Sequence, residues 1–255
     1  MCRQKSLLVL CIFAVVALFS CYRTSQISMK TIKSEEVGLG LRGTGTAVIN
    51  WGDGTPKETI TLSISGTSHY HTYNDSTPHS ITIIGGNVTF LHCGENQLTA
   101  LDVSKNPELK ELICFFNHLT ALDVSKNTAL TELYCYCNQL TTLDVSKNIA
   151  LQSLGCDSNQ LTTLDVSKNT ALTELYCYGN QLTALDVSKN TALIYLSILS
   201  NKFDAAALNY TFGTLNVNTI KEYTKTIFIS DNPGTSSCNL SIAIDKGWEV
   251  YKETE

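Results

Sequence analysis

The middle of the chain carries two alternating patterns of apolar and polar residues that recur with one fixed spacing. One reads L-x-x-L-x-C-x-x-N-x-L, the other contains L-D-V-S-K-N, and both return every 21 residues. Apolar positions two apart in "LYC" and "LDV" predict short parallel strands that turn leucine with cysteine or valine to one side. An asparagine at each bend can bond backbone groups that the turn leaves unpaired. The pattern therefore predicts coils stacked about 4.8 Å apart, with inward rows that are buried only by stacking.

The first pattern resembles the leucine-rich repeat L-x-x-L-x-L-x-x-N-x-L, with cysteine at the third apolar position. The matching positions of one unit are Leu172, Leu175, Cys177, Asn180 and Leu182. The resemblance implies a mainly β solenoid. Six cysteine-type half-repeats, starting at Val88, and five LDV-type half-repeats are expected.

Five cysteines fall at the same phase of the repeat. In a narrow interior beside leucine they are expected to pack as small buried hydrophobic residues. Neighbours in such a ladder have nearly parallel Cα–Cβ vectors, which suits disulfides poorly, although paired disulfides or a metal ladder remain alternatives. Cys137 is expected at an exposed bend, and Cys238 at the start of a last helix. The five ladder residues are Cys93, Cys114, Cys135, Cys156 and Cys177.

The outward positions of the cysteine-type strands vary and form an aromatic stripe bordered by Glu111, Glu132 and Glu174. Clustered exposed aromatic side chains are typical of interaction surfaces. The alternative is a cross-strand ladder that only stabilises the sheet. The candidate ligand-binding residues are Phe115, Tyr134, Tyr136, Asp157, Tyr176, Tyr178 and Tyr195.

The outward side of the LDV half-repeats is nearly uniform and carries one aspartate per coil. Carboxylates about 5 Å apart repel, and we expect the lysine three residues after each aspartate to relieve this. Calcium is the alternative, although one carboxylate per coil supplies few oxygen ligands. The row consists of Asp102, Asp123, Asp144, Asp165 and Asp186.

The N-terminus has the pattern of an export signal. Arg3 and Lys5 precede a short apolar run that stops at "LFSC", a run too short to span a bilayer comfortably. Its end resembles the lipobox of bacterial lipoproteins, which implies cleavage before Cys21 and a lipid on that thiol. An ordinary secretory signal is the alternative. The resemblance implies an exported protein anchored to the bacterial envelope, with the outer membrane and cell surface as its expected place.

Residues 35–87 differ in texture, with short β-rich runs separated by Gly, Thr and Ser. "AVINWGDGTPKETITLSI" predicts strand, turn and strand, "HYHTYN" a loop, and "HSITIIGG" another strand. "WGDGT", "HTY" and "SITI" resemble a PKD-type immunoglobulin-like β-sandwich, which implies Trp51 as its core aromatic residue. A metal site formed by His69, His71 and His79 is an alternative to the loop.

After Asn201 the register changes. "FDAAALNYTFGTL" has helical spacing, "KTIFISDNPG" predicts a strand and turn, "CNLSIAIDKG" a short helix ending at Gly247, and "WEV" a last strand. Because the open end of a repeat stack must be covered, the segment is expected to be a mixed α/β cap. This succession resembles the tail of bacterial cell-surface leucine-rich repeat proteins.

Charge excludes one class of partner. The net charge is −5, and no lysine- and arginine-rich cluster follows residue 33, so nucleic acid is not an expected partner. "GLGLRG" matches a dinucleotide fingerprint but is followed by a strand-like run instead of a helix. No catalytic arrangement is evident, and neither a cofactor nor a metal is expected.

These observations together predict a binding or adhesion protein that recognises a protein or carbohydrate on host or neighbouring cells through the aromatic stripe. A glycan-capture accessory of a separate hydrolase and a spacer without ligand are the alternatives. The expected regions are a signal peptide at 1–20, a linker at 21–34, a PKD-like sandwich at 35–87, leucine-rich repeats at 88–203 and a cap at 204–255.

Overall fold

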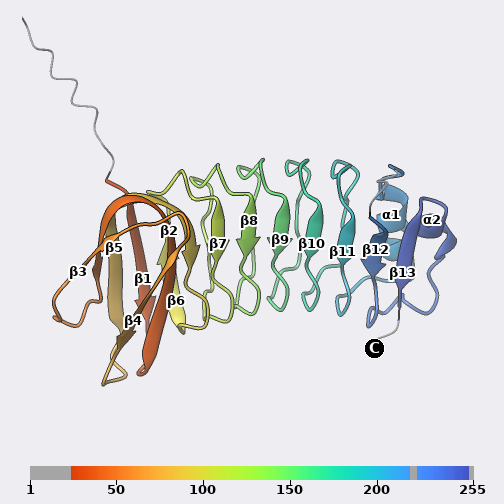
Figure 1. Ribbon diagram of the computed structural model, residues 1–255. Coiled ribbons are helices and arrows are strands. Elements are labelled where there is room, and N and C mark those ends of the chain that lie inside the picture. Colours follow the sequence, from red (N-terminus) through yellow and green to blue (C-terminus); the bar gives the residue numbers. More distant parts are fainter. Residues whose placement is uncertain (1–23, 219–222, 253–255) are drawn as a thin grey trace, which may run out of the picture.

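The computed structural model describes residues 24–218 and 223–252. Figure 1 shows an elongated molecule, with a β-rich unit at the N-terminal end, a row of stacked coils, and two helices at the C-terminal end. The expected signal peptide and Cys21 lie outside the described residues. A single 13-stranded sheet runs through the described part in the order β13-β12-β11-β10-β9-β8-β7-β5-β1-β6, and β2, β3 and β4 branch from it.

The N-terminal unit is an antiparallel arrangement built around two long strands. β2 pairs with β5 on one edge and with β3 and β4 on the other, while β1 lies between β5 and β6. "GLGLRG" lies inside β2, so no helix follows it. The strands are β1 (Gln26–Thr31), β2 (Glu36–Asn50), β3 (Glu58–Thr61), β4 (Thr67–Thr72), β5 (His79–His92) and β6 (Leu98–Asp102).

Two expectations about this unit are wrong. The segment 21–34 is not a linker, because it contains β1, whose alternating residues Ile27 and Met29 are buried between two neighbouring strands. "HYHTYN" is not a loop, because its first four residues lie in β4. Six residues with two inward apolar side chains suffice for a strand when both edges find partners.

The parallel sheet of the solenoid begins at the end of β5. The last three residues of β5 pair in parallel with the next coil through Phe90–Glu111, Leu91–Leu112 and His92–Ile113. The sheet therefore does not break at residue 88. Each following coil contributes three strand residues, in parallel and in register. These strands are β7 (Glu111–Ile113), β8 (Glu132–Tyr134), β9 (Ser153–Gly155), β10 (Glu174–Tyr176) and β11 (Tyr195–Ser197).

The inward side of the strands confirms the predicted burial of leucine and cysteine. Leu133 and Cys135 are completely buried, as are the equivalent residues of the other coils. Burial in apolar surroundings raises the pKa of Cys93 to about 12, so the thiol form prevails throughout the physiological range. The ladder cysteines act as apolar filling between the leucine rows.

An asparagine at each bend ties one coil to the next. The Nδ2 group of Asn159 donates to the carbonyl oxygens of Cys135, Cys156 and Asp157, each at 3.1 Å. Its Oδ1 atom accepts a hydrogen bond from the backbone N–H of Leu140 at 2.9 Å. A buried amide thus satisfies backbone groups of two coils, as the pattern predicts.

The LDV halves do not form the predicted strands. β6 in the first coil pairs antiparallel with β1, and the equivalent segments of the following described coils have no sheet pairing. The same Asx turn follows the aspartate in both kinds of coil: Oδ1 of Asp102 accepts from the backbone N–H of Ser104 at 2.9 Å, and Oδ1 of Asp123 accepts from that of Ser125 at 2.8 Å. The first coil differs because β1 supplies its LDV half with a partner strand, whereas the later described LDV halves have none.

The C-terminal segment covers the open end of the stack, with both predicted helices and both predicted strands present. Asp204 caps α1 by accepting from the backbone N–H of Ala207. Phe203, Phe212 and Trp248 are buried against the last coil, and β12 and β13 continue the parallel sheet beyond β11. The elements are α1 (Ala205–Thr214), β12 (Lys225–Phe228), α2 (Ser241–Ile244) and β13 (Trp248–Tyr251).

Candidate functional site

The outward side chains of the parallel strands form one surface, which we call the aromatic face. Successive coils place equivalent residues opposite one another, about 4.8 Å apart, so the side chains line up in columns that run along the stack. All the sequence-predicted site residues lie in these columns. The aromatic face comprises Phe90, His92, Phe115, Tyr134, Tyr136, Asp157, Tyr176, Tyr178, Tyr195, Phe228 and Tyr251.

Toward the N-terminal end the rings contact one another directly. The rings of Phe115 and Tyr136 are stacked, with centroids 4.7 Å apart and an interplanar angle of 12°. Phe116 packs edge-on against both rings, at 5.7 Å from each, and His92 packs edge-on against Phe115. Such contacts hold each ring in one orientation before any ligand arrives.

A second group of rings continues to the C-terminal edge of the sheet. Tyr176 lies 4.6 Å from Tyr195, Tyr195 lies 5.3 Å from Phe228, and Phe228 lies 4.9 Å from Tyr251, measured between ring centroids. The sequence prediction missed Phe228 and Tyr251, because they belong to the cap and fall outside the 21-residue spacing. The alternation in "KTIF" and "WEVY" is the signal that could have indicated them.

The coil of β9 interrupts the aromatic column with small side chains. Ser153 and Gly155 are buried, and the ring of Tyr134 leans over Gly155. The Tyr134 hydroxyl donates to Oγ of Ser153 at 3.0 Å, and this Oγ donates to Oε2 of Glu174 at 3.4 Å. The Tyr176 hydroxyl reaches the same oxygen at 3.4 Å, so a chain of hydrogen bonds crosses the middle of the face.

Asp157 departs most from the sequence expectation. It was expected to be outward and exposed, yet it is 5% exposed, because it is short and the tyrosines of the adjacent coils are long. Its Oδ1 atom is buried without a hydrogen-bond partner. Burial raises the pKa of Asp157 to about 6, although hydrogen bonds from its own backbone and from the Tyr178 hydroxyl oppose the shift.

Cys137 follows the column at the bend, as expected, but is half-buried rather than open. Its backbone is left-handed, with φ of 52°, a conformation that the equivalent Gly179 adopts with φ of 62°. Cys238 is also half-buried and lies before α2, not at its start. Burial raises the pKa of both thiols.

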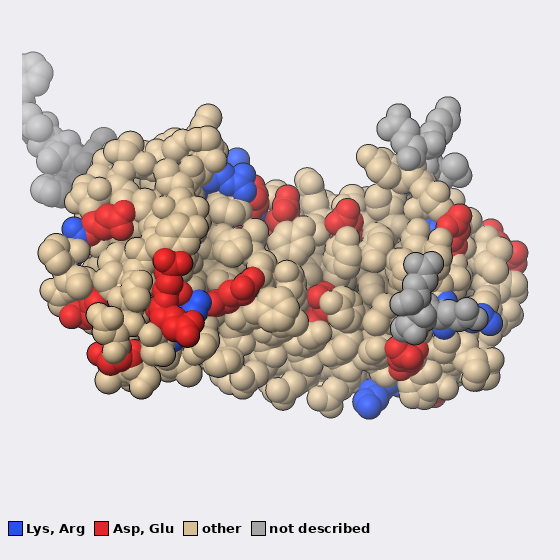
Figure 2. Space-filling view, turned by 60° about the horizontal axis from the view of Figure 1, so that its bottom comes forward, with Lys and Arg blue, Asp and Glu red and all other residues tan. Residues whose placement is uncertain are grey.

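Acidic residues border the aromatic face, as expected. Glu111 forms an ion pair with Arg42 at 2.5 Å. Glu132 forms no ion pair within the described residues, and burial, with the nearby charge of Glu111, raises its pKa. Figure 2 shows a view in which acidic side chains cover more of the surface than basic ones do. This edge therefore favours positively charged groups.

The aspartate row on the LDV side is held mainly by local turns. Hydrogen bonds from Ser125 lower the pKa of Asp123 most strongly, and the charge of Lys126 contributes less. The expectation that lysines chiefly offset this row is therefore only partly right. Within the described ranges, no group of three or more metal-binding side chains is present.

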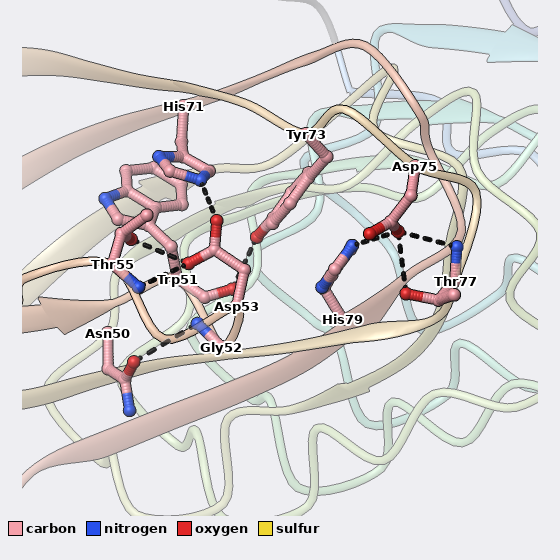
Figure 3. Close-up of polar contacts among 10 residues, drawn as sticks. All are labelled: Asn50, Trp51, Gly52, Asp53, Thr55, His71, Tyr73, Asp75, Thr77 and His79. Atoms are coloured by element: carbon pink, nitrogen blue, oxygen red, sulfur yellow. Dashed lines mark hydrogen bonds and ion pairs between the residues drawn. The ribbon is translucent and has the colours of Figure 1, made fainter.

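The three histidines of the N-terminal unit each have a separate carboxylate partner. His69 pairs with Glu58 and His71 with Asp53, both at 2.7 Å, while His79 pairs with Asp75 at 3.0 Å. In Figure 3, the His71–Asp53 and His79–Asp75 pairs lie on opposite sides of the Tyr73 ring. The three side chains are therefore not gathered as ligands of one metal ion.

Trp51 is buried, as the sequence predicts for a core aromatic residue. Its ring stacks on His71 at 5.1 Å, and its carbonyl oxygen accepts a hydrogen bond from the Tyr73 hydroxyl (Figure 3). Hydrogen bonds from Thr55, joined by one from His71, hold the pKa of Asp53 well below its usual range. The turn, β4 and the loop before β5 thus form one structural cluster.

Similarity to known proteins is found only among solved structures. No protein-family model and no curated protein matches the chain. Among solved structures, the functional domain of InlJ from Listeria monocytogenes, which includes a cysteine ladder, is 27% identical; the match covers 68% of this chain and 50% of that chain, with a TM-score of 0.36. By its stacked coils and parallel sheet, the described part of the chain is a mainly β solenoid.

Two further solved structures are similar to part of the chain. The internalin inlF of Listeria monocytogenes is 25% identical, with 55% of this chain and 40% of that chain covered and a TM-score of 0.45. A leucine-rich repeat protein of Leptospira interrogans is 22% identical, with 58% and 38% covered and a TM-score of 0.49. The chain thus spans half or less of the length of these three proteins. Within residues 24–218 and 223–252, no helix has the length and apolarity needed to cross a membrane.

Proposed function

We propose that this protein binds another protein through the aromatic face, while a lipid on Cys21 anchors it at the surface of a bacterial cell. The observation that carries the proposal is the pair of aromatic clusters, one beginning at His92 and the other ending at Tyr251, on the outward side of one run of parallel strands. Exposed aromatic side chains that cluster in this way are typical of binding hot spots.

The rings are well prepared for binding. Phe115 and Tyr136 are fixed by mutual stacking, and Tyr134 and Tyr176 by the hydrogen-bond chain through Ser153 and Glu174. Side chains that are already ordered lose little conformational freedom on association, so more of their contact energy appears as affinity. The sheet beneath them is tied together by the buried asparagines and moves little.

The LDV side is a weaker candidate. Its aspartates are engaged in Asx turns, as in Asp144 with Ser146 at 2.8 Å, and its coils are nearly identical. A surface that repeats the same side chains offers a partner no unique register. The aromatic face varies from coil to coil, and variation of this kind provides specificity.

The test is a binding screen of residues 22–255, which are the mature chain without its lipid-bearing Cys21, against extracellular-matrix proteins, with a glycan array in parallel. A variant with Tyr134, Tyr136, Tyr176 and Tyr178 changed to Ser is compared with wild type. A matched control carries Asp→Asn changes at Asp123, Asp144 and Asp165. Circular dichroism and urea unfolding show that each variant is folded.

A protein ligand lost in the tyrosine variant and retained in the control supports the proposal. A ligand retained in the tyrosine variant contradicts it and moves recognition to the N-terminal unit or the LDV side. Tyrosine-dependent binding of glycans alone supports the glycan-capture alternative. Folded protein that binds nothing in either screen leaves a spacer as the better account.

A further inference from the structure

Within the described ranges, Asp157 is the only buried carboxylate. Its Oδ1 atom has no hydrogen-bond partner, and the influences on its pKa include no lysine or arginine of the described chain. A buried carboxylate without a counter-charge costs stability, since nothing replaces the water that it has lost. A cation from outside the chain would remove this cost.

The residues on either side of Asp157 indicate which cation fits. The parallel register, extended two residues beyond Tyr134–Gly155 and Tyr176–Gly155, places Tyr136 on one side of Asp157 and Tyr178 on the other. The backbone N–H of Cys137 bonds the carbonyl of Asp157 at 3.0 Å, and that of Ser158 bonds the carbonyl of Tyr178 at 2.9 Å. Along the stack, this column therefore contains, in order, Phe115, Tyr136, Asp157 and Tyr178.

The stacking pattern of this column stops at Asp157. One face of the Tyr136 ring is covered by Phe115 at 4.7 Å, and the next aromatic residue on the other side is Tyr178, whose backbone lies two strands, or about 10 Å, away. In the free protein Asp157 is covered, so a flat group would enter as the tyrosine side chains turn aside and would then stack on their rings. The side chain at the base of this position is a carboxylate.

We propose that the aromatic face takes up one arginine side chain of its protein partner, with the guanidinium between the rings of Tyr136 and Tyr178 and paired with the Asp157 carboxylate. The inference rests on the proposed function and names the chemistry that the partner must present.

A guanidinium satisfies each feature of this position. It is planar, stacks on aromatic faces and donates a fork of two hydrogen bonds to one carboxylate. It would supply Oδ1 of Asp157 with its missing donor, and the Tyr178 hydroxyl would exchange its bond to the carboxyl for one with water or the partner. Rotation of exposed aromatic rings is fast enough to admit the group. A lysine ammonium would provide the positive charge, but it has neither the planar group that stacks on rings nor the paired donors that bind one carboxylate.

The surroundings favour a positive group as well. Glu132 and Glu174 lie two columns away on the neighbouring coils, and the groups that face Asp157 include Tyr136, Cys137 and Tyr178, whose pKa values are all raised and which stay neutral at pH 7. An arriving cation therefore meets negative charge and no like charge from these neighbours.

The experiment uses a random peptide display library selected on the folded mature chain at pH 7.5. Selected peptides are kept when their binding is lost in the variant with the four tyrosines changed to Ser. Each kept peptide is then resynthesised with every arginine replaced in turn by citrulline, its neutral isostere, and by lysine. Affinities are measured for wild type, for Asp157→Asn, and for Asp165→Asn, which makes the same change of charge on the LDV side.

We expect one arginine in each kept peptide whose replacement by citrulline weakens binding about tenfold or more, and by lysine less. Asp157→Asn should weaken the parent peptide equally and have no further effect on the citrulline peptide, because both changes remove the same contact. Asp165→Asn should change neither affinity.

The alternatives separate the two proposals. Tyrosine-dependent peptides that lack a critical arginine, or that bind Asp157→Asn as tightly as wild type, overturn the arginine inference and leave the proposed function standing. A library that yields no tyrosine-dependent peptide contradicts the proposed function itself and the inference with it.

Discussion

The ring of Tyr134 occupies the space above the Cα atom of Gly155 in the next coil, so a Cβ atom at position 155 would lie 2.9 Å from Cδ1 of that ring. Because Gly155 has no side chain, the Tyr134 ring can pack against its backbone. In this position the Tyr134 hydroxyl donates to Ser153. The shape of the middle of the aromatic face depends on one missing side chain.

Replacing Gly155 by Ala should displace the Tyr134 ring and break its hydrogen bond to Ser153, at a cost of about 1–3 kcal/mol in the free energy of unfolding. Near-ultraviolet circular dichroism would report the ring movement, and urea unfolding the stability. Gly213→Ala is the matched control, because nothing lies within 4 Å of a Cβ atom there. Because Gly213 lies in the last turn of α1, the alanine should stabilise by at most about 0.5–1 kcal/mol. An unchanged Gly155→Ala protein would show that the ring is not held as described.

The burial of Asp157 makes stability depend on pH in an unusual direction. Because the folded-state pKa is about 6 and the ordinary value of an aspartate is near 4, the folded chain binds this proton more tightly than the unfolded chain does. The favourable contribution of the protonated form is complete below about pH 4 and is lost as pH rises through 6.

Asp157→Asn, which cannot ionise, should therefore be more stable than wild type at pH 8 by about 1–3 kcal/mol. Near pH 4 the two proteins should be equally stable. Urea unfolding at pH 4.5, 6 and 8 measures the difference. Asp165→Asn serves as control and should show no gain at high pH, since hydrogen bonds from Ser167 lower the pKa of Asp165. A difference that does not vary with pH would mean that Asp157 is not desolvated.

The bend asparagines should dominate the cohesion of the stack. Asn159→Ala removes three donated hydrogen bonds and leaves the backbone N–H of Leu140 without its acceptor, so a loss of about 3–5 kcal/mol is expected. Gln160→Ala, at the exposed neighbouring position, should change stability by less than about 0.5 kcal/mol. Thermal unfolding of both variants measures the two losses of stability. Equal losses would show that the asparagine does not hold neighbouring coils together.

The cysteine ladder should be protected from thiol reagents in the folded state. Treatment of the soluble mature chain with iodoacetamide, followed by mass spectrometry, should label Cys137 and Cys238 first, because these two are half-buried and the ladder is completely buried. Unfolding in guanidinium should expose the remaining five to labelling. Early labelling of Cys156 in native protein would contradict the packing role.

The solenoid can be predicted from the sequence because each coil repeats the same requirements for burial and hydrogen bonding. Leu133 and Cys135 must turn inward, Asn138 must satisfy the bend, and a fixed spacing of 21 residues repeats these requirements. Period and polarity therefore predicted the inward rows and the aromatic columns. Among the described LDV halves, only that of the first coil forms a strand, because β1 pairs with it; the later halves carry the same three-residue alternation without a partner strand.

Other features depend on contacts that no local pattern encodes. β1 is a strand because β5 and β6 flank it, although its six residues alone carry a weak signal. Asp157 is buried because of the tyrosines of two neighbouring coils. Phe228 joins the aromatic face because the cap returns to the sheet in register with Tyr195 and Ser197, which the irregular segment after residue 201 does not reveal.

The most direct test of recognition through the aromatic face is fluorine NMR of the mature chain labelled with 3-fluorotyrosine, with and without a protein ligand found in the screen. The chain has 11 tyrosines, and those among the described residues lie on the aromatic face, in the N-terminal unit and in the cap. We predict that the ligand shifts the resonances of Tyr136 and Tyr178 most and leaves those of Tyr70 and Tyr210 unchanged. Shifts confined to Tyr70 or Tyr210, with Tyr136 and Tyr178 unaffected, would contradict recognition through the aromatic face.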